Sequence, residues 1–171
     1  MRTRLLLPLS LAALIPVSLC CYDVEEEGRI WVGTDHADSA IVGGHTTTGW
    51  DSVVMLYAGG GICTGTVVAP DVILTAAHCL EGVYGAMEVF WWDACIQGGY
   101  LYYDYMRTSN DYHQHNQYNP NTMVADIAVV VLTGNSPTDP YGINRTAPAN
   151  NNNNWVMDPI TFVGFGVTNY Y

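Results

Sequence analysis

The sequence predicts an all-β fold, and two observations indicate it. Apolar residues occur in short runs that are separated by glycine, proline, asparagine or aspartate. No segment shows the sustained spacing of apolar residues that a long helix requires. Many short strands joined by glycine-rich turns are typical of a β-barrel or a β-sandwich.

The apolar runs are predicted as strands, and the residues between them as turns and loops. A run of glycines at 59–61 and the pair Pro70-Asp71 separate neighbouring strands, and residues 75–80 are expected to form a single helical turn. Two polar stretches, 110–122 and 147–154, are predicted as surface loops, the second because it contains consecutive asparagines. The predicted strands are residues 53–57, 65–69, 72–75, 87–92, 100–106, 127–132 and 160–164.

The first 21 residues are typical of a secretion signal. Arg2 and Arg4 are followed by an apolar run that ends in small residues and cysteine. That run is shorter than the roughly 20 apolar residues of a membrane-spanning helix, so we expect no transmembrane span in the mature chain. Cys20 or Cys21 offers an alternative, a lipid anchor on a cell-surface lipoprotein. Leu19 is unfavourable before such a cleavage site, so ordinary secretion is the expectation.

Residues 22–40 are predicted to be a flexible acidic pro-segment. Glu25, Glu26 and Glu27 stand in a row, and the segment has no hydrophobic period. The globular part is expected to begin with Ile41-Val42-Gly43-Gly44.

The chain is acidic, with a formal net charge of −11 and no lysine. Binding to nucleic acid requires a basic surface that neutralises phosphates, so we expect no nucleic-acid partner. An anionic membrane surface is disfavoured for the same reason.

Two segments carry a family resemblance. The residues from Ile62 to Cys79, ending in Thr75-Ala76-Ala77-His78-Cys79, closely resemble the histidine box of chymotrypsin- and trypsin-like serine endopeptidases. The run Asp126-Ile127-Ala128-Val129-Val130-Val131-Leu132 resembles the aspartate box of that family. The order histidine before aspartate fits this family and differs from the orders of subtilisin-like enzymes and α/β-hydrolases.

The resemblance implies the family's double Greek-key β-barrel, with the active site in the cleft between the two barrels. Residues 41–171 would then form a trypsin-like peptidase domain that holds the first barrel and the start of the second. It implies peptide or protein substrates, no cofactor and no metal. It also implies a disulfide between Cys63 and Cys79, which would leave Cys95 without an obvious partner.

The resemblance assigns the catalytic roles to His78 and Asp126. A histidine titrates near neutral pH, so it can take a proton from a hydroxyl group and return it to a leaving amine. An aspartate can accept a hydrogen bond from the other ring nitrogen and hold the required tautomer. Without the resemblance, His78 would be interpreted as an ordinary packed histidine, and Asp126 as an aspartate that caps a strand.

No Gly-Asp-Ser-Gly-Gly nucleophile motif follows Asp126 in the sequence. Ser136 is the remaining downstream serine, and its neighbours Gly134, Asn135 and Pro137 predict a turn. We therefore expect a C-terminally incomplete serine endopeptidase that is inactive as it stands. The alternatives are a non-catalytic homologue that binds a peptide or protein, and one half of a split protease.

The resemblance also makes Ile41 the new N-terminus after activating cleavage. Ala40 precedes it in place of arginine or lysine, which disfavours a trypsin-like activator. A second, weaker candidate site follows Arg29.

Two other groups of residues are candidates for ligand binding. Alternate residues Asp111, His113 and His115 could share one face of a strand and hold a metal, but a polar loop with solvated imidazoles is the favoured interpretation. An aromatic cluster could stack a carbohydrate or a base, although a strand-rich surface explains it equally well. Its members are Trp91, Trp92, Tyr100, Tyr102, Tyr103 and Tyr105.

Overall fold

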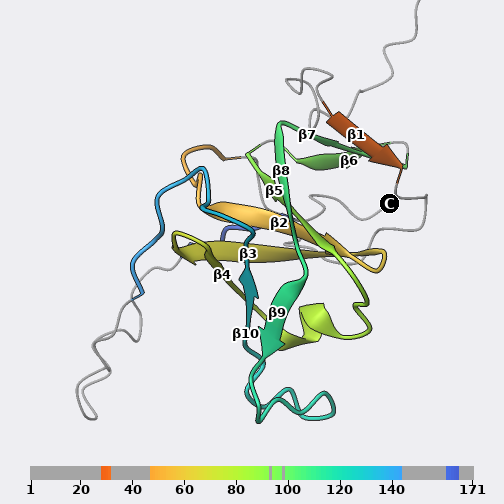
Figure 1. Ribbon diagram of the computed structural model, residues 1–171, viewed down its shortest axis with the longest axis vertical. Coiled ribbons are helices and arrows are strands. Elements are labelled where there is room, and N and C mark those ends of the chain that lie inside the picture. Colours follow the sequence, from red (N-terminus) through yellow and green to blue (C-terminus); the bar gives the residue numbers. More distant parts are fainter. Residues whose placement is uncertain (1–27, 32–46, 93, 98, 144–160, 166–171) are drawn as a thin grey trace, which may run out of the picture.

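β-Strands make up nearly all of the regular structure in the computed structural model (Figure 1). The structure describes residues 28–31, 47–92, 94–97, 99–143 and 161–165. A short 3-10 turn, η2 (Ala77–Leu80), follows β4, as the sequence predicted for residues 75–80. The all-β prediction is therefore confirmed. Among the described residues, no helix has the length and apolar character needed to cross a membrane.

The strands form two antiparallel sheets. The larger sheet has the order β8-β5-β2-β3-β4-β10-β9, and the smaller has the order β1-β7-β6. The strands are β1 (Gly28–Trp31), β2 (Val53–Ala58), β3 (Gly61–Ala69), β4 (Val72–Thr75), β5 (Met87–Trp91), β6 (Cys95–Gln97), β7 (Tyr100–Tyr103), β8 (Tyr105–Ser109), β9 (Asp111–Gln114) and β10 (Ala128–Val131).

The larger sheet curls until its two outer strands meet. β8 and β9 stand at opposite ends of the strand order, yet Asn110 alone connects Ser109 to Asp111. A single residue cannot span a flat seven-stranded sheet, because strands lie nearly 5 Å apart. The buried hydroxyl of Ser109 donates to the carbonyl of Val131 in β10, which joins the two ends. Figure 1 shows β8 leading directly into β9.

The inside of the curled sheet is filled by alternate residues of its strands. Successive side chains of a strand point to opposite faces, so one residue in two faces inward. In β5, for example, Met87, Val89 and Trp91 are all fully buried on this face. The core members are Val54, Leu56, Val67, Ile73, Ala77, Leu80, Met87, Val89, Trp91, Ala128, Val130 and Leu132.

A second, smaller core lies on the outer face of β2 and β5. Met55 and Phe90 come from these strands, and Leu101 of β7 covers them. The ring of Phe90 lies 5.1 Å from that of Tyr103, also in β7. This core fixes β7 against the larger sheet.

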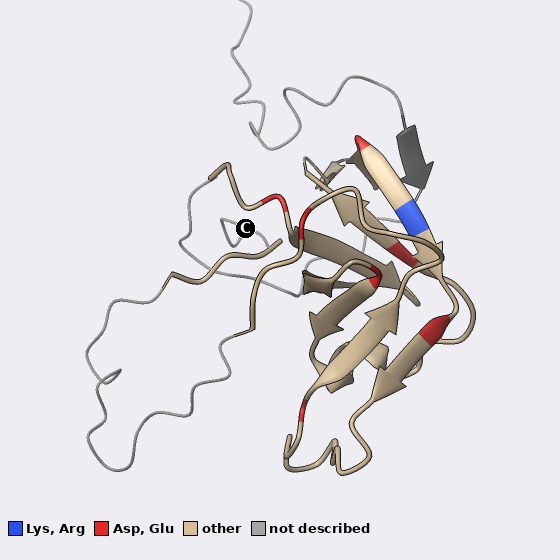
Figure 2. Cartoon of the chain, turned by 60° about the vertical axis from the view of Figure 1, so that its left-hand side comes forward, with Lys and Arg blue, Asp and Glu red and all other residues tan. Residues whose placement is uncertain are grey.

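Charged side chains are sparse in the described part of the chain. Figure 2 shows acidic positions scattered over several strands and loops. Arg107 lies in β8. The guanidinium carbon of Arg107 lies 5.5 Å from the ring centroid of Tyr105, a separation typical of a cation–π contact.

Two predicted strands and one predicted loop need correction. The predicted strand 100–106 is divided at Asp104, because β7 belongs to the smaller sheet and β8 to the larger. The predicted loop 110–122 contains β9, an edge strand with mostly exposed side chains and therefore no hydrophobic pattern. Residues 161–164 form no strand; instead, the amide of Phe165 donates to the hydroxyl of Thr64.

The predicted flexible pro-segment, residues 22–40, also contains a strand. β1 pairs with β7 through main-chain groups, which need no hydrophobic period in the sequence. The predicted signal at 1–21, the activation residue Ile41 and the asparagine-rich stretch at 147–154 lie outside the described residues.

Candidate active site

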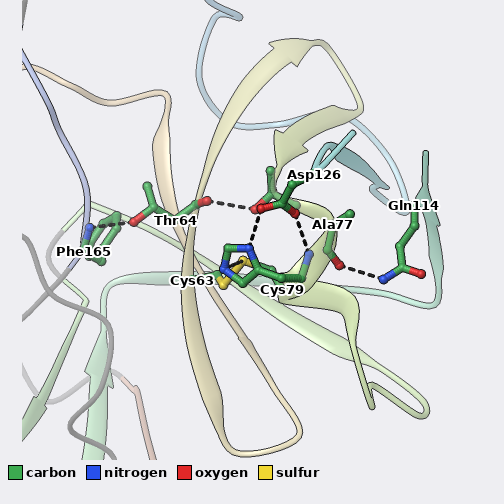
Figure 3. Close-up of a disulfide and its surroundings, with 9 residues drawn as sticks. Cys63, Thr64, Ala77, Cys79, Gln114, Asp126 and Phe165 are labelled. Carbon is green, nitrogen blue, oxygen red and sulfur yellow. Dashed lines mark hydrogen bonds and ion pairs between the residues drawn. A yellow bond between two sulfur atoms is a disulfide. The ribbon is translucent and has the colours of Figure 1, made fainter. Parts of the chain in front are cut away.

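The 3-10 turn that contains His78 is linked to β3 by a disulfide. Cys79 follows His78 in η2, and it is bonded to Cys63 of β3, with the two Cα atoms 6.1 Å apart (Figure 3). The disulfide implied by the family resemblance is therefore present. It holds the backbone next to His78 against the centre of the larger sheet.

Strand pairing brings His78 close to Asp126. β4 precedes the turn of His78 and β10 follows Asp126, and the two strands are antiparallel, with Thr75 opposite Ala128. The residues just after Thr75 and those just before Ala128 must therefore lie at the same end of the pair. Two positions far apart in the sequence are thus adjacent in the fold.

Both oxygens of the Asp126 carboxylate contact the same residue. Oδ1 accepts a hydrogen bond of 2.8 Å from the backbone N–H of His78, and Oδ2 lies 2.8 Å from Nδ1 of its ring (Figure 3). A carboxylate can only accept, so Nδ1 carries a proton in this arrangement. In the neutral imidazole, the other ring nitrogen, Nε2, then carries the free lone pair that a general base requires.

The pKa of Asp126 is held below its ordinary value. Desolvation by itself would raise the pKa of this carboxyl, but hydrogen bonds favour its charged form and prevail. Those bonds come from the ring of His78, the backbone of His78 and the backbone of Ala77. The carboxylate is therefore ionised at neutral pH and can stabilise an imidazolium.

His78 remains accessible from outside. Its side chain is 47% exposed, whereas that of Asp126 is 21% exposed. A surface hollow of about 260 Å³ lies beside it, and the Nε2 atom is 3.6 Å from the disulfide sulfur of Cys79. The hollow is lined by Leu56, Ala58, Gly59, Gly61, Ile62, Cys63, His78, Cys79, Glu81, Gly82, Val83 and Met87.

Side chains from β9 and the loop after it support the turn of His78. The side-chain amide of Gln114 donates to the carbonyl of Ala77 at 2.7 Å (Figure 3). The hydroxyl of Tyr118 donates to the carboxylate of Glu81 at 2.6 Å, and this bond raises the pKa of Tyr118 to about 12. Sequence reasoning missed both residues, because each lies in a polar stretch without a recognisable motif.

The backbone just before Asp126 adopts an unusual conformation. Ala125 has a φ of 55°, in the left-handed region that residues with a side chain seldom enter. The amide of Ile127 donates to the carbonyl of Ala125 at 2.8 Å, which turns the chain tightly around Asp126. This turn aims the carboxylate at His78 before β10 begins.

The other candidate residues do not join this site. The hydroxyl of Ser136 lies 3.0 Å from that of Thr138 and accepts a hydrogen bond from its amide, in the turn predicted for it. The backbone of Cys95 lies in β6, opposite Tyr102. Ile41 is outside the described residues.

The candidate metal group does not assemble around a common point. His113 Nε2 lies 2.7 Å from Asp111 Oδ1, and both side chains are more than half exposed. The ring of His115 instead accepts a hydrogen bond from the amide of Gln117. Cys63, His78 and Cys79 cluster closely, but the two sulfurs are bonded to each other and so are not thiolate ligands.

The aromatic cluster is mainly a packing feature. Trp91 is fully buried, and its ring meets that of Tyr105 edge-on at 5.7 Å. Trp92, which is 40% exposed, also meets Tyr105 at 5.7 Å. The arrangement fits the structural interpretation of the cluster better than a stacking platform.

Comparison with known proteins points to one family. The family model described as Trypsin matches residues 41–170. Trypsin delta of Drosophila melanogaster is 32% identical over 127 residues, which are 66% of this chain and 46% of that protein. Trypsin beta of Drosophila erecta is 35% identical over 103 residues, 56% of this chain and 38% of that protein. The chain thus spans less than half the length of these relatives.

One solved structure, titled as HL collagenase, is similar over 54% of this chain and 42% of its own, with 22% identity and a TM-score of 0.45.

Proposed function

Because this chain belongs to the trypsin family, we propose that it supplies the histidine and aspartate of a secreted serine endopeptidase. The observation that carries the proposal is the double contact between His78 and Asp126, with Nδ1 and Oδ2 2.8 Å apart. In this role Nε2 of His78 removes the proton from a serine hydroxyl, and Asp126 stabilises the imidazolium that results. Peptides or proteins are the proposed substrates.

The serine itself is the missing component. The 171 residues contain no Gly-Asp-Ser-Gly-Gly motif after Asp126, and the hydroxyl of Ser136 is held in a turn by Thr138. Since no acyl-enzyme can form without a nucleophile, we propose that this chain alone does not hydrolyse peptides.

The proposed compartment is outside the cytoplasm. The first 21 residues are typical of a secretion signal, and the disulfide between Cys63 and Cys79 belongs to an oxidising environment. Secretion of a reporter protein fused to residues 1–25 would test this, with Leu5→Arg and Leu6→Arg together as the variant that should remain inside the cell.

The decisive experiment is to sequence the gene beyond the Tyr171 codon and to assay the resulting chain. A nucleophile motif in frame, or one base out of frame, should give peptide hydrolysis that a serine-directed covalent inhibitor abolishes. In that chain, Asp126→Asn should lower kcat by about 10⁴-fold, because the histidine loses its required tautomer. Activity that survives His78→Ala would contradict the roles proposed here.

Two other functions would give different results. If the gene ends at Tyr171 and the purified chain unfolds cooperatively without any hydrolysis, a binding role for a non-catalytic homologue is favoured. If a second chain from the same source creates inhibitor-sensitive activity on mixing, the protein is half of a split protease.

A further inference from the structure

The main chain of β1 pairs with the body of the protein along one edge of the smaller sheet. Its partner is β7, with Gly28, Arg29, Ile30 and Trp31 opposite Tyr103, Tyr102, Leu101 and Tyr100. β7 is the middle strand, since β6 pairs with its other edge. If β1 were removed, one edge of β7 would expose unpaired main-chain groups.

β7 is also held by contacts that do not involve β1. Leu101 is fully buried in the outer core, and Tyr103 packs on Phe90 of the larger sheet. β6 holds the opposite edge through three residue pairs, from Cys95 to Gln97. The edge that receives β1 is therefore preformed.

The kind of ligand that fits this edge is an extended peptide. Addition of a strand to a sheet edge is driven by main-chain hydrogen bonds, and side chains add selectivity. We propose that the β7 edge is a strand-binding site, occupied by this chain's own residues 28–31 while residues 32–46 tether them, and vacated when that tether is cut.

The tether matters because the bound strand is short. Four paired residues make few hydrogen bonds, each of small net value in water. A covalent connection raises the local concentration of the strand to the order of millimolar, which keeps a weak ligand bound. Cleavage removes that advantage, so the strand dissociates and other extended segments can bind. Cleavage before Ile41 would be a natural trigger; this trigger rests on the proposed function, whereas the binding site does not.

A pair of proline substitutions tests the occupancy. In an antiparallel pair, successive residues alternate between facing the partner strand with their N–H and C=O groups and facing away. Of Arg29→Pro and Ile30→Pro, only one therefore removes a hydrogen bond to β7, and the other is its matched control.

Amide hydrogen exchange on the two full-length variants gives the measurement. One variant should lose at least tenfold protection at alternate amides of residues 100–103, and the other should keep the protection of the unchanged protein. Amides of β2 and β5 report that both variants remain folded. Unchanged protection in both variants would overturn the proposal, and loss in both would contradict the register.

Cutting the tether tests the release. With a specific protease site engineered within residues 33–39, the cut protein should lose its N-terminal piece on gel filtration, and residues 100–103 should exchange at least tenfold faster. A piece that stays bound would overturn the proposed release. Protection that rises with protein concentration before cutting would show strand exchange between copies and overturn the placement within one chain.

Adding a peptide tests the class of ligand. A synthetic peptide with the sequence of residues 26–33, at millimolar concentration, should restore protection to the cut protein, and a scrambled peptide should not. Failure of the first peptide, or equal success of both, would contradict a strand-binding site. None of these three experiments requires peptidase activity, so they remain interpretable even if the proposed function is wrong.

Discussion

At Asp126 the two carboxylate oxygens fix one residue in two ways. Oδ1 accepts a hydrogen bond from the backbone N–H of His78, and Oδ2 contacts its ring. The first contact fixes the position of the main chain, and the second fixes the orientation of the imidazole. The disulfide of the neighbouring Cys79 anchors the same turn from the other side. The geometry of the pair is thus set before any substrate binds.

Replacement of this carboxylate should weaken the dependence of the free energy of unfolding on pH in the acidic range. The pKa of Asp126 is lowered in the folded protein from its ordinary 3.8, so its stabilising effect is fully present above that value and is lost as pH falls through the folded-state pKa. Asp126→Asn should cost about 1 kcal/mol at pH 7, given the partial exposure of the pair. The cost should shrink below about pH 3.8.

Urea unfolding at pH 7 and at pH 3 gives both values. Asp51→Asn, at an exposed position, is the control and should unfold within about 0.5 kcal/mol of the unchanged protein. An equal cost of Asp126→Asn at both pH values would contradict the linkage.

The left-handed conformation of Ala125 predicts a stabilising substitution. Ala125→Gly removes the steric cost of a φ of 55°, and we expect a gain of up to about 1 kcal/mol. The same change at Ala76, where φ is −82°, should instead cost about 0.5–1 kcal/mol, because glycine gains freedom in the unfolded chain. Thermal unfolding of the two variants should therefore shift in opposite directions.

Among the elements, β3 is the central strand of the larger sheet and carries the disulfide. It pairs with β2 on one side and β4 on the other, and its register shifts between Val67 and Ala69. At Gly65 the strand comes so close to its neighbours that an added Cβ would lie 2.5 Å from Cγ2 of Ile73. Glycine is thus required here by packing rather than by a turn.

Gly65→Ala should destabilise the protein by about 1–3 kcal/mol, because the core must shift to admit one methyl group. Gly142→Ala is the matched control, since no atom lies within 4 Å of its added Cβ. That control should be neutral or slightly stabilising. Chemical denaturation of both variants measures the difference, and equal stabilities would contradict the packing at Gly65.

Some strands could be predicted from the sequence and others could not. The strands β2, β4, β5 and β10 are short runs of mostly apolar residues, and such runs are visible in the sequence. β9 has mostly exposed side chains, so nothing in its composition distinguished it from a loop. β1 pairs with β7 by main-chain groups, which every residue carries, so the pairing requires no particular sequence.

At the scale of the whole molecule, the larger sheet is a curled, cross-linked unit. It is curled because β8 leads directly into β9, and it is cross-linked by the disulfide between β3 and η2. The disulfide closes a loop with a sequence separation of 16 residues. On the chain-entropy account, a loop of that size restricts the unfolded chain enough to stabilise the fold by roughly 3 kcal/mol.

The double variant Cys63→Ala with Cys79→Ala should therefore lose about 3 kcal/mol of stability. The unchanged protein unfolded in the presence of a reductant should lose a similar amount. Urea unfolding of the double variant and of the reduced and oxidised unchanged protein checks this. If the reductant destabilises the double variant equally, the effect does not arise from this disulfide.

The sequence by itself determined the family and the all-β class, and it identified His78 and Asp126 as candidate catalytic residues. These features depend on local signals, namely contiguous motifs and short apolar runs that are bounded by turn residues. Only the tertiary structure decided where the chain passes between sheets at Asp104, that β1 and β9 are strands, and that Gln114 and Tyr118 support the turn of His78. Main-chain pairing at a sheet edge leaves no pattern in the sequence, because it uses backbone groups rather than side chains. A single long-range hydrogen bond leaves none either, because any polar residue in the right place can make it.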